Sequence, residues 1–400
     1  MINIAILGYG TIGSGVDEVL RVNRDVIAKR VGDVIDVKYV LDLRDFPDDP
    51  IQEKIVHDYN VILNDPEVSI VVEAMGGEEP AHTFAVQALE AGKHFATSNK
   101  ALIARFGAEL IALGQKKSRS VLFEASVGGG IPIIRPINDC LTADVLEEIS
   151  GILNGTTNYM MTSMAENGSE FDDVLKEAQR LGYAEADPTA DIEGHDACRK
   201  IAILTSLASR KQVDFEDIST QGITGISATD MKYAAAMGRR IKLLAMSRKT
   251  ENSYCALVAP FLLDSTHPLY SVNDVFNAVF VRGNVLGDAM FYGAGAGKLP
   301  TASAVVSDII EIAKNPDIHI ASDWSAEKIT LDSELDLTFR YFVRTADDAA
   351  AVEAAFGKVE YISVPEITGE TAFITESMDG HAYEAAAGKL SGVLQMIRVD

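Results

Sequence analysis

The sequence predicts an α/β protein with an N-terminal Rossmann-type doubly wound sheet, an α+β middle section and a C-terminal ferredoxin-like domain. The chain opens with a strand, a glycine-rich turn and a helix, which is typical of a Rossmann-type sheet. Strands then alternate with helices up to about residue 150, as in a parallel sheet. The order βαββαβ after residue 336 is the ferredoxin-like plan.

Length, composition and charge set limits on the function. With 400 residues, of which 47% are hydrophobic and 24% charged, the chain suits a globular protein of two or three domains. A net charge of −24 argues against nucleic acid or an anionic membrane surface as a partner. We expect neither a transmembrane helix nor a signal peptide. Cys140, Cys198 and Cys255 have no metal or disulfide spacing, so we expect a cytoplasmic protein.

The first motif lies between a strand at Ile2 to Leu7 and an amphipathic helix. It reads Gly8-Tyr9-Gly10-Thr11-Ile12-Gly13. In this context GxGxxG predicts a dinucleotide site, because its glycines allow a tight turn, a close approach of pyrophosphate and packing of helix on strand. The N-terminus of the helix then faces the phosphates.

The second strand, Val34 to Leu41, bears on cofactor choice. Asp42 and Arg44 follow it. An acidic residue here binds ribose hydroxyls, whereas an arginine meets a 2′-phosphate. The choice between NAD and NADP therefore stays open.

Later strands of the first part end in further candidate residues. After strands at Ser69 to Ala74 and His94 to Thr97, Lys100 follows beyond the carboxyl end, where doubly wound sheets bind ligands. The alternative is a solvated surface lysine. After a strand at Val121 to Glu124, three glycines precede Pro132 and leave carbonyl groups free to turn toward a ligand. We consider a monovalent cation site that includes Glu124, or a plain turn.

The middle section begins with a strand at Val145 to Leu153. Asn154-Gly155-Thr156-Thr157-Asn158 then opens a helix, whose free N–H groups suit a carboxylate. We predict a helix of core residues from about Thr229 to Met246 and strands between Leu257 and Val285. A second glycine-rich segment, Phe291 to Ser303, leads into a further helix.

The stretch from Leu181 to Lys200 is crowded with carboxylates and ends in an apolar helix. Asp196 and Lys200 are four residues apart, so they share a face of that helix. The pattern is typical either of a site for a small cationic ligand or of a solvated acidic loop.

Seven motifs together resemble homoserine dehydrogenase, in that family's order, over about the first three quarters of the chain. They are GYGTIG at 8–13, VVEAMGG at 71–77, SNKA at 98–101, EASVGGGIP at 124–132, GILNGTTNYM at 151–160, GYAEADPTADIEGHDACRK at 182–200 and YGAGAGKLPTAS at 292–303. The C-terminal βαββαβ pattern resembles the ACT domain at the end of many family members.

The resemblance implies oxidation of L-homoserine to L-aspartate 4-semialdehyde, or the reverse, with NAD or NADP, in threonine and methionine biosynthesis. It implies that Lys200 donates or accepts the proton and that Lys100 lies at the reacting centre and the nicotinamide. It assigns the substrate to Gly155, Thr156, Gly182, Tyr183, Glu185, Asp191 and Asp196, and further cofactor contact to Gly297. It assigns a cation, often sodium, to Glu124 and the carbonyl groups of Val127, Gly129 and Ile131.

The resemblance also implies an organisation. We expect a dinucleotide-binding domain at 1–150 plus about 300–320, a substrate-binding, catalytic and dimerisation domain at 151–299, and an ACT-like regulatory domain at 336–400. Threonine would be the effector, and the assembly would be a homodimer or homotetramer.

The chemistry agrees with the residues present. Homoserine is a zwitterion, so its ammonium group needs carboxylates and its carboxylate needs N–H donors, and the sequence supplies both. A lysine with a depressed pKa, or one that acts through water, can take the hydroxyl proton. Two alternatives are an aspartate-semialdehyde dehydrogenase with Cys198 as nucleophile and a non-catalytic amino-acid sensor. Against the first, Cys198 has no histidine at a suggestive spacing; against the second stand the lysine and carboxylate set.

Overall fold

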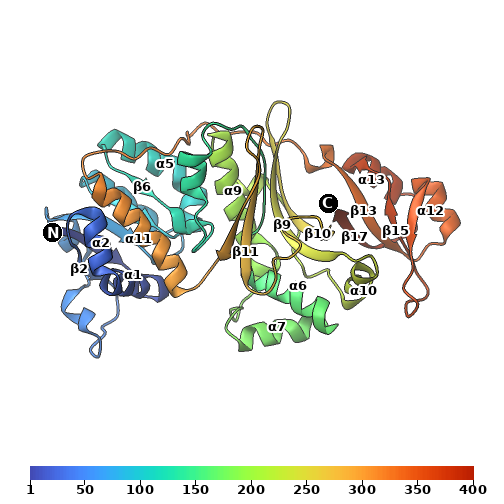
Figure 1. Ribbon diagram of the computed structural model, residues 1–400, viewed down its shortest axis with the longest axis horizontal. Coiled ribbons are helices and arrows are strands. Elements are labelled where there is room, and N and C mark those ends of the chain that lie inside the picture. Colours follow the sequence, from blue (N-terminus) through green and yellow to red (C-terminus); the bar gives the residue numbers. More distant parts are fainter. The chain divides into compact units, whose positions relative to one another are not determined.

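The computed structural model describes residues 1–400, which form two compact units (Figure 1). The first unit comprises residues 1–145, 202–215 and 293–329, and the second comprises residues 146–201, 216–292 and 330–400. Each unit is therefore assembled from segments that are far apart in the sequence. The three-domain division proposed from the sequence stays a prediction.

The first unit contains a six-stranded parallel sheet in the order β3-β2-β1-β4-β5-β6. Its strands are β1 (Ile2–Leu7), β2 (Ile35–Leu41), β3 (Ile55–Val56), β4 (Val68–Glu73), β5 (His94–Thr97) and β6 (Val121–Leu122). The strand order reverses between β1 and β4, where doubly wound sheets bind their ligands. The predicted Rossmann-type sheet is confirmed.

Helices from the N-terminal region and from residues 298–314 cover this sheet. They are α1 (Thr11–Val22), α2 (Arg24–Val31), α3 (Tyr59–Leu63), α4 (Ala81–Glu90), α5 (Lys100–Lys117) and α11 (Lys298–Lys314). α11 packs beside α1 (Figure 1), and α4 packs beside α5. Ile4 and Ile6 of β1, Val16 of α1 and Val305 and Ile309 of α11 share one buried core. The apolar run of β1 is thus typical of a parallel strand that is covered on both faces.

The second unit is built on an eleven-stranded mixed sheet in which β12-β11-β7-β9-β10 continues into strands of the C-terminal region. The strands of its first part are β7 (Leu146–Ile152), β8 (Ser219–Thr220), β9 (Arg240–Lys249), β10 (Tyr254–Leu263), β11 (Phe276–Gly283) and β12 (Gly287–Ala294). The helices are α6 (Gly155–Asn167), α7 (Phe171–Arg180), α8 (Thr189–Ile192), α9 (His195–Ser209), which continues into the first unit, and α10 (Ala228–Ala236).

The helix predicted from Thr229 to Met246 is wrong in its second half. α10 ends at Ala236, and Gly238 takes a φ of +64°, after which residues 240–249 form β9. β9 pairs with β10 on one side and β7 on the other, and residues 241–247 are buried. A central strand that is covered on both faces has a continuous apolar run, which periodicity alone cannot distinguish from a buried helix.

The C-terminal region has the predicted βαββαβ order with one short strand added. Its elements are β13 (Thr338–Thr345), α12 (Ala349–Phe356), β14 (Val359–Ile362), β15 (Thr371–Thr375), β16 (Met378–Asp379), α13 (Gly380–Ala387) and β17 (Val393–Val399). Phe356 of α12 packs on Phe373 of β15, and Tyr383 of α13 stacks on Tyr341 of β13, so both helices cover one face (Figure 1). β17 also pairs in parallel with β10, which makes one continuous sheet.

Candidate active site

The glycine-rich turn between β1 and α1 forms a cradle in the first unit. Gly8 has a φ of +90°, a conformation that favours glycine. A Cβ at Gly13 would lie 1.9 Å from the carbonyl oxygen of Gly8, whereas a Cβ at Gly10 would meet no atom within 4 Å. Gly13 therefore lets α1 approach the turn, and Gly10 faces open space.

A cavity of about 520 Å³ opens beside this turn. Its lining includes Gly8, Gly10, Asp42, Arg44 and His57. Backbone N–H groups at a helix N-terminus, a glycine that leaves space and polar residues after β2 are what a dinucleotide needs. The residues present therefore fit such a cofactor.

Asp42 and Arg44 form one closely bonded pair at the end of β2. The Arg44 guanidinium donates from Nε and Nη2 to the two carboxylate oxygens of Asp42, at 3.0 and 2.9 Å. The backbone N–H groups of Tyr9 and Arg44 also donate to that carboxylate. Arg44 holds the pKa of Asp42 well below its usual range. Asp42 is thus fixed as an anion, while the Arg44 side chain is 61% exposed.

The ends of β4 and β5 are linked by hydrogen bonds beside the start of α5. Thr97 Oγ1 donates to the buried carboxylate of Glu73 at 2.5 Å, and Asn99 caps α5 by accepting from the N–H of Leu102. Lys100 is the first residue of α5, at the carboxyl end of β5. The predicted position of Lys100 at the ligand-binding edge of this sheet therefore agrees with the structure.

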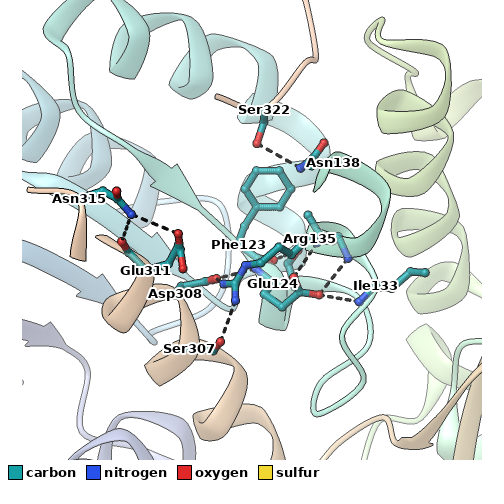
Figure 2. A network of polar contacts seen from close by, with 12 residues as sticks. Phe123, Glu124, Ile133, Arg135, Asn138, Ser307, Asp308, Glu311, Asn315 and Ser322 are labelled. Atoms are coloured by element: carbon teal, nitrogen blue, oxygen red, sulfur yellow. Dashed lines mark hydrogen bonds and ion pairs between the residues drawn. The ribbon is translucent and has the colours of Figure 1, made fainter. Parts of the chain in front are cut away.

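The loop after β6 places the carboxylate of Glu124 against backbone amides (Figure 2). Glu124 Oε1 accepts from the N–H groups of Ile133 and Ile134 at 2.7 and 2.9 Å, and Oε2 accepts from that of Arg135 at 2.7 Å. A carboxylate has about four acceptor positions, so these bonds leave one on Oε2. Glu124 is 4% exposed, and its carboxylate stabilises the turn that follows Pro132 through these hydrogen bonds.

A second buried carboxylate, Asp308 of α11, stands next to Glu124 (Figure 2). Asp308 accepts from the backbone N–H of Glu124 at 2.9 Å and pairs with the Arg135 guanidinium at 2.6 Å. Burial, followed by the charge of Glu124, raises the pKa of Asp308 to about 7, against the opposing effect of Arg135. The network ties α11 to the loop after β6.

The two glycine-rich segments of the first unit touch each other. A Cβ at Gly129, whose φ is +56°, would lie 2.4 Å from the carbonyl oxygen of Gly295, and the N–H of Gly130 donates to the carbonyl of Ala294. Val127 and Ile131 are buried in the same loop. Gly297, with a φ of +114°, is the N-cap residue of α11. The predicted cation residues therefore lie in one tightly packed loop.

In the second unit, the C-terminal half of the acidic stretch, from Asp191 to Lys200, contributes to a buried ionic cluster. Lys200 Nζ lies 2.8 Å from Asp196 Oδ2, and these side chains are only 9% and 5% exposed. Lys200 also donates to the carbonyl of Leu153 at 2.7 Å. The expectation that Asp196 and Lys200 share a helix face is confirmed, and the alternative of a solvated loop does not hold for this pair.

Asn154, expected from the sequence only to open a helix, also joins the cluster. Its Nδ2 donates to Asp191 Oδ1 at 2.7 Å and to Asp196 Oδ2 at 3.0 Å. Burial raises the pKa of Asp191, as does the nearby charge of Asp196, while the hydrogen bond from Asn154 lowers it. The sequence signals for Asn154 were its place in the GILNGTTNYM motif and at the opening of a helix, where asparagine is a common cap, but neither signal pointed to the carboxylates.

The other predicted substrate residues surround the start of α6. Gly155 is the first residue of α6, and Thr156 Oγ1 donates to the carbonyl of Tyr183 at 2.7 Å. Gly182 has a φ of +76° in the turn after α7. Glu185 is exposed on the same turn and takes no part in the hydrogen bonds that join Asp191 to Asp196. The structure thus brings Thr156 next to Tyr183, but not Glu185 into the cluster.

The thiol of Cys198 does not suit a nucleophile. Cys198 is 5% exposed, and burial raises its pKa. A reactive cysteine needs the opposite, an accessible thiolate stabilised by positive charge. The geometry therefore argues against the aspartate-semialdehyde dehydrogenase alternative.

None of the helices is both long and apolar enough to cross a membrane.

Comparisons with known proteins point to one family. A family model described as homoserine dehydrogenase matches residues 132–310, and one described as the NAD binding domain of homoserine dehydrogenase matches residues 8–124. The chain is 42% identical over 329 residues to a homoserine dehydrogenase of Bacillus subtilis, covering 80% of this chain and 75% of that protein. It is 43% identical over 379 residues to that of Synechocystis, covering 92% and 85%.

Solved structures give the same result. A homoserine dehydrogenase from Thiobacillus denitrificans superposes with a TM-score of 0.92 at 36% identity, covering 100% of this chain and 98% of that one. A hyperthermophilic archaeal homoserine dehydrogenase in complex with NADPH superposes with a TM-score of 0.65 at 28% identity, covering 78% and 97%.

Proposed function

The chain belongs to the homoserine dehydrogenase family of NAD(P)-dependent oxidoreductases, and from that premise we propose how its residues act. The proposed reaction interconverts L-homoserine and L-aspartate 4-semialdehyde. The observation that carries the proposal is the buried Asp196–Lys200 pair at 2.8 Å, which offers an anchor for an ammonium group and a proton carrier on one helical turn.

The substrate amino acid is held at both of its charged ends. Asp191 and Asp196 bind the ammonium group, and Glu185, which lies outside their cluster, adds negative charge from the exposed turn nearby. The N–H groups at the start of α6, at Gly155 and Thr156, bind the carboxylate together with the turn of Gly182 and Tyr183, because a helix N-terminus favours anions. Fixing both ends orients the reacting alcohol, and orientation alone contributes about 7–11 kcal/mol in well-aligned reactions.

Lys200 transfers the proton. It takes the hydroxyl proton as homoserine is oxidised and returns it to the carbonyl oxygen in the reverse direction. The bound nicotinamide cofactor supplies the acceptor or donor of the hydride. Lys100, at the start of α5, adds positive charge that favours deprotonation of the hydroxyl.

The Asp42–Arg44 pair supports use of both cofactors. Asp42 can bind the ribose hydroxyls of NAD, and the exposed guanidinium of Arg44 can meet the 2′-phosphate of NADP. Because Arg44 neutralises Asp42, the carboxylate repels that phosphate less than an isolated anion would. We expect Arg44→Ala to raise KM for NADP more than KM for NAD, and Asp42→Asn to do the reverse.

We further propose a monovalent cation, with sodium the first candidate, at Glu124 and the carbonyls of Val127, Gly129 and Ile131. One carboxylate and neutral carbonyls suit a single charge better than a divalent ion. Bound there, the cation would hold the loop after β6. We also propose that residues 336–400 act as an ACT-like domain that senses threonine and that the chain assembles as a homodimer or homotetramer.

A spectrophotometric assay tests the proposed function. Purified protein, L-homoserine and either NAD or NADP should give absorbance of the reduced nicotinamide, and L-aspartate 4-semialdehyde should reverse it. Repeating the assay with sodium exchanged for a bulky organic cation tests the cation site, and added threonine tests regulation. No turnover with either cofactor in either direction would refute the assignment of the reaction.

A further inference from the structure

Asn154 is built into the fold in a way that fixes the orientation of its amide group. It lies between β7 and α6 as the N-cap residue of α6, and it is 7% exposed. Its Oδ1 accepts from the backbone N–H and the hydroxyl of Thr157, at 2.9 and 3.1 Å. Because a backbone N–H can only donate, Oδ1 must face α6 and Nδ2 must face away from it.

The other side of the amide meets only acceptors. Nδ2 uses its two hydrogens on two carboxylates that belong to different elements, Asp191 of α8 and Asp196 of α9, at 2.7 and 3.0 Å. Lys200 of α9 is the third charged group of the cluster, and it pairs with the same Asp196 that accepts from the amide. The preceding residue, Leu153, accepts from Lys200 with its carbonyl. Two consecutive residues of the β7–α6 connection therefore hold both the anchor and the proton carrier.

The other residue types that cap helices cannot make these contacts. Serine or threonine can cap α6 but is too short to reach the carboxylates as well. Aspartate has the same shape and also caps α6, but it presents a third negative charge and, when ionised, no donor. Asparagine holds two carboxylates together without adding charge, so the cluster stays net negative and can receive one ammonium group.

We infer that Asn154 is a positioning residue, which holds Asp191 and Asp196 in the geometry that takes the substrate ammonium group. The inference rests on the proposed function. Asn154 acts before any chemistry, through the affinity for the amino acid. Its side chain bonds to Thr157, Asp191 and Asp196, and in our proposal it does not touch the reacting carbon.

Two variants test this role. Asn154→Ser retains a helix cap but loses both bonds from Nδ2, and hydrogen bonds to charged groups of this kind correspond to about a 10- to 100-fold effect. We expect KM for homoserine to rise by about that factor, with a smaller change in kcat and no change in affinity for NADPH. Asp348→Ser, which alters the cap of α12 in the C-terminal region, is the matched control and should leave KM unchanged.

Asn154→Asp gives a readout that a purely structural cap would not move. When the carboxyl group of this variant is protonated it regains one donor, so the ratio of kcat/KM of the variant to that of the unmodified enzyme should rise as pH falls. A flat ratio from pH 9 to pH 6, or an unchanged KM in Asn154→Ser, would overturn the inference while leaving the reaction intact. Calorimetric titration of homoserine into the enzyme with NADP is a second readout that does not need turnover. Absence of both binding and turnover in the unmodified enzyme would instead refute the proposed function and the inference with it.

Discussion

Replacement of Lys200 by methionine tests the central ion pair of the site, because methionine retains most of the length of the side chain and removes its charge. Lys200 and Asp196 are 9% and 5% exposed and 2.8 Å apart. Removal of one partner from a buried pair costs about 3–5 kcal/mol. At about 2–4 °C per kcal/mol for a domain of about 150–250 residues, which is the size of the second unit, Tm of that unit should fall by about 6–20 °C. Loss of the proton carrier should lower kcat by about 10²–10⁴-fold.

The assay combines thermal unfolding, turnover of homoserine and titration with NADPH. Affinity for NADPH should be unchanged, since the cradle at Gly8 to Gly13 is untouched. Adding Asp196→Asn to Lys200→Met should restore part of Tm, because the carboxylate that lost its partner is then neutral, but should not restore turnover. Lys176→Met is the control: Lys176 is 74% exposed, and its pair with Asp173 is a surface one. Turnover of Lys200→Met within about 10-fold of the unmodified enzyme would refute the role of Lys200.

Four further substitutions test other parts of the molecule. Gly10→Ala should fold normally but weaken NADPH binding. Gly13→Ala should lower Tm as well, because its Cβ would lie 1.9 Å from the carbonyl oxygen of Gly8. Equal Tm values in the two variants would contradict this interpretation. Burial lowers the pKa of Lys242 from 10.5 to about 7. Between these two pH values the folded state binds fewer protons than the unfolded state. The free energy of unfolding should therefore rise with pH in this range, by at most about 1.4 kcal/mol per pH unit. Tm of Lys242→Met, measured from pH 7 to pH 10, should lack this rise, and a parallel pH profile would count against the lowered pKa. Arg344 forms ion pairs with Asp230 of α10 at 2.6 Å and with Glu370 at 2.8 Å. Arg344→Met should therefore lower Tm and, in our proposal, weaken inhibition by threonine. Unchanged inhibition curves would show that these ion pairs have no part in regulation.

The sequence alone was enough for the elements whose signals are local. Five of the six parallel strands of the first unit (all but β3), the glycine turn at 8–13 and the βαββαβ order of the C-terminal region follow from short-range patterns of apolar residues, glycines and caps. The i to i+4 spacing of Asp196 and Lys200 likewise predicted their contact, because helical geometry alone brings such residues together.

Only the tertiary structure decided the features that depend on distant partners. Residues 240–249 form a strand because β7 and β10 lie on either side of them, which no local pattern records. Asn154 faces Asp191 and Asp196 across 37 and 42 residues of chain. The physical reason is the same in both cases: pairing and burial are long-range, so the meaning of an apolar run or an asparagine is fixed by what the fold brings against it.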